Sequence, residues 1–242
     1  MGEGWARGPA AHRLQGDALT ANTNKLPGTD AARHGTGDAD LTIMMAAHEA
    51  LRRDLVGLAH AAGDAGQTGA ARGEAVQRGW AVFQRQLHIH HTAEDELIWP
   101  VLRERLAHSD AARSVLDAMA AEHQQIDPVL AAVNRAMGQP GGDDGTLGDT
   151  VDVLTMALHG HLAHEEREAL PLIGTALTAA EWRAVGRRIG VQNLRHAPEM
   201  FAWMLDGADP EEARAAVGTL PPPARVLYRT VWRPRFARRA RW

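Results

Sequence analysis

Two short motifs in the chain combine a histidine with a glutamate four residues later. They are His90-x-x-x-Glu94 and His161-x-x-x-Glu165. Residues at i and i+4 lie about 40° apart around an α-helix, so the imidazole and the carboxylate of each motif would project together. Such a pair can bind a metal ion or join a buried hydrogen-bonded network.

A single histidine precedes each motif on a separate helical pattern. His48 comes before the first motif and His123 before the second, 75 positions later. The two motifs are 71 positions apart, and Pro100 and Pro171 follow them at the same distance. This internal repeat predicts two helical hairpins related by duplication.

Apolar residues at helical spacing surround these polar ones in four segments. Glycine-rich breaks at 63–73 and 138–149 and a turn at 106–109 separate the segments. The sequence therefore predicts an all-α fold, an up-down-up-down four-helix bundle over residues 39–175. The four stripes are Leu41, Met44, His48, Leu51, Leu55, Leu58; Val76, Trp80, Phe83, Leu87, His90, Glu94, Leu97, Val101; Leu116, Met119, His123, Ile126, Leu130, Val133, Met137; and Val151, Leu154, Leu158, His161, Glu165, Glu168 or Ala169, Leu172.

Six polar residues therefore occupy stripes that a bundle would bury. A buried ionised carboxylate costs several kcal/mol unless it is paired, hydrogen-bonded or bound to a cation. One histidine on an apolar face is more often a satisfied core residue, but six polar residues at matched depth favour a metal site. A metal-free His–Glu network is the alternative. The six are His48, His90, Glu94, His123, His161 and Glu165.

The donor types restrict the metal. The chain has no cysteine, which excludes disulfides, iron–sulfur clusters and thiolate zinc sites. Imidazole and carboxylate donors suit iron, manganese or zinc. Four histidines and two glutamates exceed the needs of one tetrahedral zinc, and suit two adjacent six-coordinate ions with bridging glutamates and open positions. Glu-x-x-His and His-Glu-x-x-His do not occur, which argues against ferritin-like storage and zinc peptidases.

The ordered set of six residues resembles the hemerythrin-like family, also called HHE cation-binding domains, over roughly residues 38–175. HHTAEDELIWP and HLAHEEREALP are similar to the family's stretch that contains His-x-x-x-Glu-Glu and ends at proline. The resemblance implies a bundle with a non-haem di-iron centre, in which Glu94 and Glu165 bridge the two irons. It also implies activities such as O₂ binding, NO or redox sensing, iron sensing, and reaction with peroxide.

Two departures from the oxygen-carrying hemerythrins are visible. Their fifth histidine, four residues after the third-helix histidine, is Asp127 here, and their final aspartate bridge would be Glu165. The chain therefore resembles the bacterial type more closely, and reversible O₂ carriage becomes less favoured. Asp127 itself could orient or ligate.

Several other histidines and one glutamate lie close in sequence to the six predicted ligands, and their expected roles differ. His164 shares the face of His161 and could ligate or form a hydrogen bond behind a ligand. His91 and Glu122 flank proposed ligands but should be turned about 100° away, which favours an outer or surface role. His88 and His159 should lie on the surface or between helices.

The ends of the chain differ from the middle. Residues 1–38 are predicted to be a flexible leader, without a secretory signal. No apolar run is long enough to span a bilayer, and a cytoplasmic location is expected. Net charge is −4, yet no acidic residue follows Glu212. We expect the basic tail to lie on the chain's own acidic surface, with nucleic-acid or membrane contact less favoured. Its arginines are Arg225, Arg229, Arg233, Arg235, Arg238, Arg239 and Arg241.

Residues 176–242 are predicted to form a short helical extension. Thr178 and Glu181 make a capping-box pattern at the start of a helix, two short helices should follow in 198–205 and 209–218, and prolines at 221–223 break the chain. The extension could cap the bundle, or dock a partner protein or a second copy as a homodimer.

The leading functional hypothesis is a di-iron binding protein that meets O₂, NO or H₂O₂ as a redox or gas sensor or a stress protein. One alternative is an oxidoreductase of catalase or peroxidase type. Another is a metal-free structural or interaction bundle. Manganese and zinc are the alternatives to iron.

Overall fold

The computed structural model describes residues 39–63, 70–138 and 144–242, and this part of the chain is helical without a strand. The all-α expectation is confirmed. The predicted leader, 1–38, lies outside the described residues, as do 64–69 and 139–143 within the two glycine-rich breaks. Among the described helices, none combines the length and apolar character that crossing a membrane requires.

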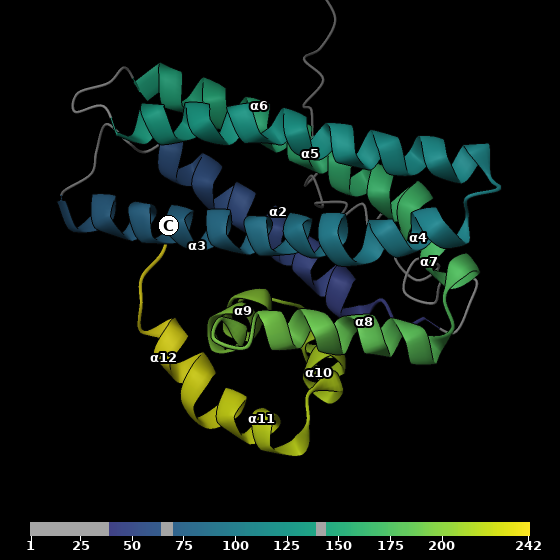
Figure 1. The fold of residues 1–242 in the computed structure, drawn as a ribbon. Coiled ribbons are helices and arrows are strands. Elements are labelled where there is room, and N and C mark those ends of the chain that lie inside the picture. Colours follow the sequence, from purple (N-terminus) through teal and green to yellow (C-terminus); the bar gives the residue numbers. More distant parts are fainter. Residues whose placement is uncertain (1–38, 64–69, 139–143) are drawn as a thin grey trace, which may run out of the picture.

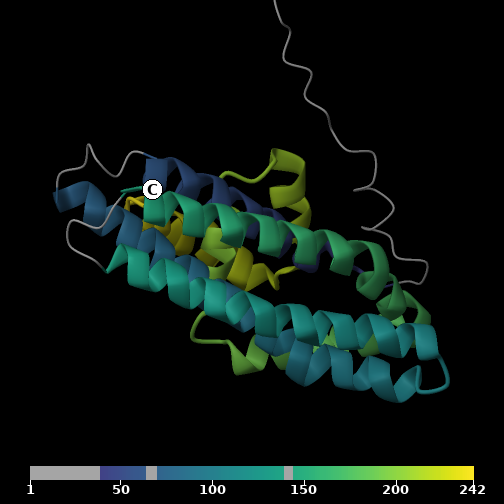
Figure 2. The same cartoon turned by 90° about the horizontal axis from the view of Figure 1, so that it is seen from above.

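Four long helices form the centre of the molecule: α2 (Thr42–Gly63), α3 (Ala70–Ala93), α5 (Asp110–Met137) and α6 (Asp144–His164). They lie side by side in both views (Figures 1 and 2). Contacts join α2 to α3 and α6, and α5 to α6 and α3. Ser109 begins α5 by accepting a hydrogen bond from the backbone N–H of Ala112 at 3.2 Å, which confirms the predicted turn before it.

Two of these helices begin earlier than the glycine-rich patterns predict. Helix α3 begins at Ala70 and α6 at Asp144, inside the segments that we expected to be breaks. Helix α6 runs through Gly148, and Leu147 beside it packs against the core. Burial of one apolar side chain in the first turns outweighs the weak helix propensity of a neighbouring glycine.

Three π-helical turns interrupt the helices, at Glu94–Ile98, Glu165–Ala169 and Tyr228–Trp232. In each, the backbone N–H that follows the turn donates to the carbonyl of its first residue. Each turn ends two residues before a proline, which lacks an N–H and would collide with the carbonyl four residues earlier. A widened turn relieves that collision. The prolines are Pro100, Pro171 and Pro234.

Helices α4 (Trp99–Arg105) and α7 (Leu170–Ala176) continue the chain after the first two π-helical turns. Because each turn begins at the glutamate of a His-x-x-x-Glu motif, the widened backbone is located where both glutamates face inward. The third turn has no such motif but is also followed by a proline, whereas Pro128 lies inside α5 without a π-helical turn.

The apolar core is divided in two, and the polar residues of the motifs lie between the parts. On α2, His48 separates Met45, in one apolar cluster, from Leu51, in the other. On α5, His123 separates Met119 from Ile126 in the same way. The predicted stripes are therefore buried, with one polar layer across them.

The C-terminal extension is helical along most of its length. It contains α8 (Ala179–Gln192), α9 (Ala197–Met204), α10 (Pro210–Thr219), α11 (Pro222–Leu227) and α12 (Arg233–Ala237). The capping box that we predicted begins α8, and the two short helices predicted after it are α9 and α10. The basic tail is not irregular after the prolines, because a helix begins within them and continues through α12.

The last two residues return to the long helices and form what we call the C-terminal latch: Arg241 and Trp242 bound to Asp54. The guanidinium of Arg241 donates to the Asp54 carboxylate at 2.9 and 3.2 Å, and the Trp242 indole N–H donates to it at 3.1 Å. Trp203 on α9 donates a further hydrogen bond at 2.7 Å. The chain therefore ends against α2 and α3 (Figure 1).

This latch corrects the expectation for the basic tail. Arg241 does bind the chain's own acidic residues, Asp54 and Asp206. Arg225 instead donates to the backbone carbonyls of Leu220 and Gly218. Within the described part of the chain, the other arginines of the tail form no ion pair with a carboxylate. These are Arg229, Arg233, Arg235, Arg238 and Arg239.

Candidate metal centre

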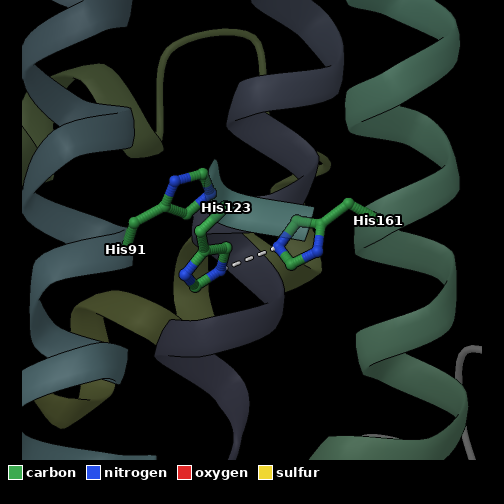
Figure 3. A group of neighbouring side chains, drawn as sticks. All are labelled: His91, His123 and His161. Carbon is green, nitrogen blue, oxygen red and sulfur yellow. Dashed lines mark hydrogen bonds between the residues drawn. The ribbon is translucent and has the colours of Figure 1, made fainter. Parts of the chain in front are cut away.

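Two adjacent groups of buried side chains could each hold a metal ion. Within each group the donor atoms lie within 4.8 Å of one another. The three-histidine group combines His91 on α3, His123 on α5 and His161 on α6 (Figure 3). The four-residue group combines donors of α2, α3 and the two π-helical turns. Its members are His48, His90, Glu94 and Glu165.

The two glutamates lie between the groups. Glu94 places Oε1 3.1 Å from Nε2 of His90 and Oε2 3.4 Å from Nε2 of His123. Glu165 places Oε2 3.2 Å from Nε2 of His48 and 4.0 Å from Nε2 of His161. Each carboxylate therefore faces histidines of both groups, which is the position of a bridging ligand.

The structure brings together all six residues that the sequence predicts for the site and adds a seventh, His91. We expected His91 to turn away, and this expectation is wrong. It is 9 % exposed, and its ring stacks on that of His123 with centroids 3.9 Å apart and planes at 13°. Leu87, His91, Glu94 and Ile98 are spaced by four, three and four, which is also helical spacing and shares Leu87 and Glu94 with the stripe that contains His90. That spacing was the signal available in the sequence.

Several donor atoms of the four-residue group make no hydrogen bond of normal geometry within the described structure, although His48 with Glu165 and His90 with Glu94 lie at ion-pair distance. They include Nε2 of His48 and His90 and both carboxylate oxygens of Glu94 and of Glu165. Nε2 of His91 shares this state in the other group. A buried polar atom without a partner costs about 1–3 kcal/mol, and a charged one costs more. So many together are explained if the site receives a cation.

Carboxylates outside the two groups orient three of the histidines. In each case the carboxylate contacts Nδ1, so that Nδ1–H donates outward and Nε2 faces the centre. This is the arrangement by which proteins fix the tautomer of a metal-binding histidine. The pairs are His48 with Glu166 at 2.7 Å, His123 with Asp95 at 3.0 Å, and His161 with Glu122 at 2.9 Å.

The three-histidine group shows the consequence of this orientation. Nε2 of His123 and Nε2 of His161 lie 3.2 Å apart (Figure 3). Both Nδ1 atoms are already bound to carboxylates, so two Nε2 lone pairs would face one another in the neutral rings. A proton or a cation between them removes that repulsion, and a cation can also use His91.

Burial and the neighbouring charges set the protonation of the metal-free site. Burial, together with Glu165, raises the pKa of Glu94 well above its ordinary value. Burial lowers the pKa of His90 and of His91, so both rings are neutral and able to ligate. Burial also lowers the pKa of His48, but the Glu165 carboxylate outweighs it and raises that pKa to about 9. Metal uptake would therefore displace protons from His48 and Glu94.

The flanking residues that the sequence left open lie outside both groups. His164 contacts Oε1 of Glu122 through Nδ1 at 2.7 Å, and its side chain is 23 % exposed. Glu122 therefore joins His161 to His164, an outer role consistent with our expectation for it. Asp127, His88 and His159 are exposed, and for the two histidines this agrees with the surface position expected.

Comparison with known proteins agrees with the geometry. A search of the curated proteins and a search of the solved structures each found no match. The family model of the hemerythrin HHE cation-binding domain matches residues 39–173, more than half of the chain, and this span contains all seven donor residues. The chain belongs to the hemerythrin HHE cation-binding domain family.

Proposed function

We propose that the protein holds two iron ions, one at each donor group. The observation that carries this proposal is the pair of adjacent buried groups whose donor atoms lack other partners. The three-histidine group would hold one ion and His48 with His90 the other. Glu94 and Glu165 would bridge them, because their oxygens approach histidines of both groups.

The donor chemistry is compatible with iron and argues against a single zinc ion. Five imidazoles and two carboxylates without sulfur suit iron, manganese or zinc. A tetrahedral zinc site would use four donors and leave three buried ones unsatisfied. Iron at these positions would supply reversible redox chemistry and binding of O₂, NO or peroxide. The protein's own residues would orient the ions and keep them apart from solvent.

The helical arrangement that would position these donors is an up-down-up-down four-helix bundle over residues 39–175, with 176–242 as an extension. In support, α2 contacts α3 and α6, and α5 contacts α6 and α3, which closes a ring of four helices. Each helix of that ring contributes a histidine to the polar layer.

The physiological role that fits best is a redox or gas sensor or stress protein that responds to O₂, NO or peroxide. Helix α2 supports this role because it contains both His48, in the centre, and Asp54, in the C-terminal latch. A change at the metal could therefore reach the extension through a single helix. A ligand-dependent change in proteolysis of the extension, without turnover of the ligand, is the expected result for a sensor.

A peroxide-consuming oxidoreductase is the second candidate, and one contact favours it. Glu122 connects the buried His161 to the partly exposed His164, whose Nε2 lies 3.5 Å from Glu168 near the surface. This chain of groups could carry a proton between the centre and solvent. Sustained O₂ release from added peroxide, lost in His164→Ala with metal content unchanged, would support this candidate over the sensor.

The experiment that tests metal binding is metal analysis of protein purified with iron available. About two ions per chain are expected, with a sharp loss in His90→Ala and in Glu165→Ala. His88→Ala is the matched control, because it removes an exposed histidine from the same helix two residues earlier. Negligible metal in the wild type would instead favour a metal-free structural bundle, and one zinc ion per chain would contradict the di-iron proposal.

A further inference from the structure

The C-terminal segment 222–239, which comprises α11, the π-helical turn Tyr228–Trp232, α12 and the two residues after it, exposes both apolar side chains and arginines. Val226 is 61 % exposed, Leu227 45 % and Val231 46 %. We call this surface, together with the five arginines that form no ion pair with a carboxylate of the described residues, the basic amphipathic face. Those arginines are Arg229, Arg233, Arg235, Arg238 and Arg239.

This face belongs to a helix that is firmly attached on its other side. Tyr228 and Phe236 are 6 % and 9 % exposed and join the main apolar core, and Trp232 packs against that core. Arg241 lies over the Phe236 ring at 4.7 Å and ties the end of the segment to Asp54. The orientation of the helix is therefore fixed, and the same side always faces outward.

The position of the segment leaves that side uncovered by the other described helices. Helices α11 and α12 lie at the lower edge of the molecule in Figure 1, across α3 from α5 and α6. No acidic residue occurs after Glu212, so the segment contains no carboxylate side chain to offset its arginines. Because the arginines are spread along residues 229–239, a partner that complements this face must carry negative charge over an extended surface.

We propose that the basic amphipathic face binds an anionic lipid surface, with the helix lying in the plane of the interface. Arginines would contact lipid phosphates while Leu227, Val231 and Val226 enter the boundary of the acyl chains. Nucleic-acid backbones would use the arginines alone and give the three exposed apolar side chains no favourable environment. The apolar component therefore favours lipid. Such docking would place the metal centre beside a membrane without a spanning helix.

The test is co-sedimentation of the full-length, metal-loaded protein with vesicles. One set contains phosphatidylcholine alone, and the other contains phosphatidylcholine mixed with phosphatidylglycerol. The wild type should bind the mixed vesicles and not the neutral ones, and added salt should weaken the binding. Absence of binding to the mixed vesicles would overturn the proposal.

Two paired variants separate the two components of the face. Arg235→Glu with Arg239→Glu should weaken vesicle binding at least about tenfold through charge reversal. Leu227→Ser with Val231→Ser should weaken it by a similar factor, about tenfold, by removing the apolar contact. The matched control, Arg187→Glu with Arg188→Glu on α8, makes the same charge change at exposed arginines elsewhere and should bind like the wild type.

Two further measurements give the other partners a distinct outcome. Fluorescence anisotropy with an oligonucleotide would favour nucleic acid if the arginine pair weakened binding while the Leu227→Ser, Val231→Ser pair did not. A wild-type dimer in analytical ultracentrifugation that became a monomer in the serine pair would assign the face to a second copy. Either result would overturn the lipid proposal. Circular dichroism and metal content, unchanged in all variants, would show that each still folds.

Discussion

The metal centre and the C-terminal latch both bury carboxylates, but they satisfy them in opposite ways. Asp54 is 4 % exposed, and its oxygens accept hydrogen bonds from Arg241, Trp203 and Trp242. Glu94 and Glu165 are fully buried, and none of their four oxygens has a hydrogen-bond partner within the described structure. The latch is therefore complete in the protein alone, whereas the centre keeps donor atoms that a cation could bind.

Helix α2 contributes one buried ionisable residue to the metal centre and another to the C-terminal latch. His48 and Asp54 are six residues apart on it, and both are buried. A buried ionisable residue by itself therefore does not identify a functional site. The distinguishing feature is whether the protein itself supplies hydrogen-bond partners to the buried residue. Buried polar groups that lack such partners are usually retained where a ligand, an ion or a water molecule binds them.

The largest expected effect on stability is that of removing the metal. Chelation of iron should lower the Tm by about 10 °C or more, because two ions at about a hundredfold excess over Kd contribute about 2.7 kcal/mol each. Differential scanning calorimetry with and without chelator measures the shift. In Glu94→Ala the chelator should have little effect, and an unchanged Tm in the wild type would mean that the centre is complete without metal.

Neutralising a carboxylate in the metal-free protein should destabilise the fold at the latch and have little effect at the metal centre. Asp54→Asn should lower the free energy of unfolding by about 1–3 kcal/mol, because the partly buried Arg241 loses one of its two carboxylate partners. Glu94→Gln should change it by less than about 1 kcal/mol, because the raised pKa of Glu94 already favours the neutral form. Urea unfolding measures both values. An equal loss in the two variants would show that Glu94 is a structural residue like Asp54.

Loss of a carboxylate that orients a histidine should weaken metal binding without abolishing it. Glu166→Gln weakens the hydrogen bond that orients His48, so metal affinity should fall about tenfold to a hundredfold without loss of folding. Equilibrium titration with a competing chelator measures the affinity. Glu168→Gln is the matched control, because Glu168 is an exposed carboxylate in the same π-helical turn, and it should bind metal like the wild type. Equal affinities for all three proteins would contradict an orienting role.

The smallest expected effect concerns the glycines under the latch. A Cβ at Gly57 would lie 2.6 Å from the Trp242 ring, so Gly57→Ala should displace that ring and lower the free energy of unfolding by about 1–3 kcal/mol. Urea unfolding followed by tryptophan fluorescence measures the change. Gly186→Ala on α8 meets nothing within 4 Å and should be neutral or stabilising by up to about 1 kcal/mol. Metal content should not change in either variant. Equal stabilities for both would indicate that Trp242 does not pack there.

The sequence was sufficient to predict the polar layer but not all its members. Helical spacing predicted that His48 and His123 share a depth with the two His-x-x-x-Glu motifs, and the structure brings all these residues together. His91 was not predicted because it lies beside the single stripe expected for its helix, whereas the folded α3 buries it as well as Phe83 and Leu87 of that stripe. A helix packed against more than one neighbour has a wider buried face than a single seam.

The latch could not be predicted because its contacts join residues almost two hundred positions apart. In the sequence Asp54 is one of two acidic residues on α2, and Arg241 is one of several arginines of a basic tail. Only the folded chain places Trp242 against Gly57 and Gly79, where the absence of Cβ leaves room for an indole. The predicted starts of α3 and α6 were also wrong. Glycine lowers the local helix propensity, but burial of a nearby apolar side chain, which propensity does not include, offsets that cost.

The most direct test of the central claim is the stoichiometry of iron(II) binding to metal-free protein without oxygen. Titration of the wild type should reach saturation at two ions per chain. His91→Ala should lose occupancy at the three-histidine group and reach about one or fewer, whereas His159→Ala, an exposed control, should still bind two. Saturation of the wild type at a single ion, or two ions retained in His91→Ala, would contradict the assignment of one metal to each donor group.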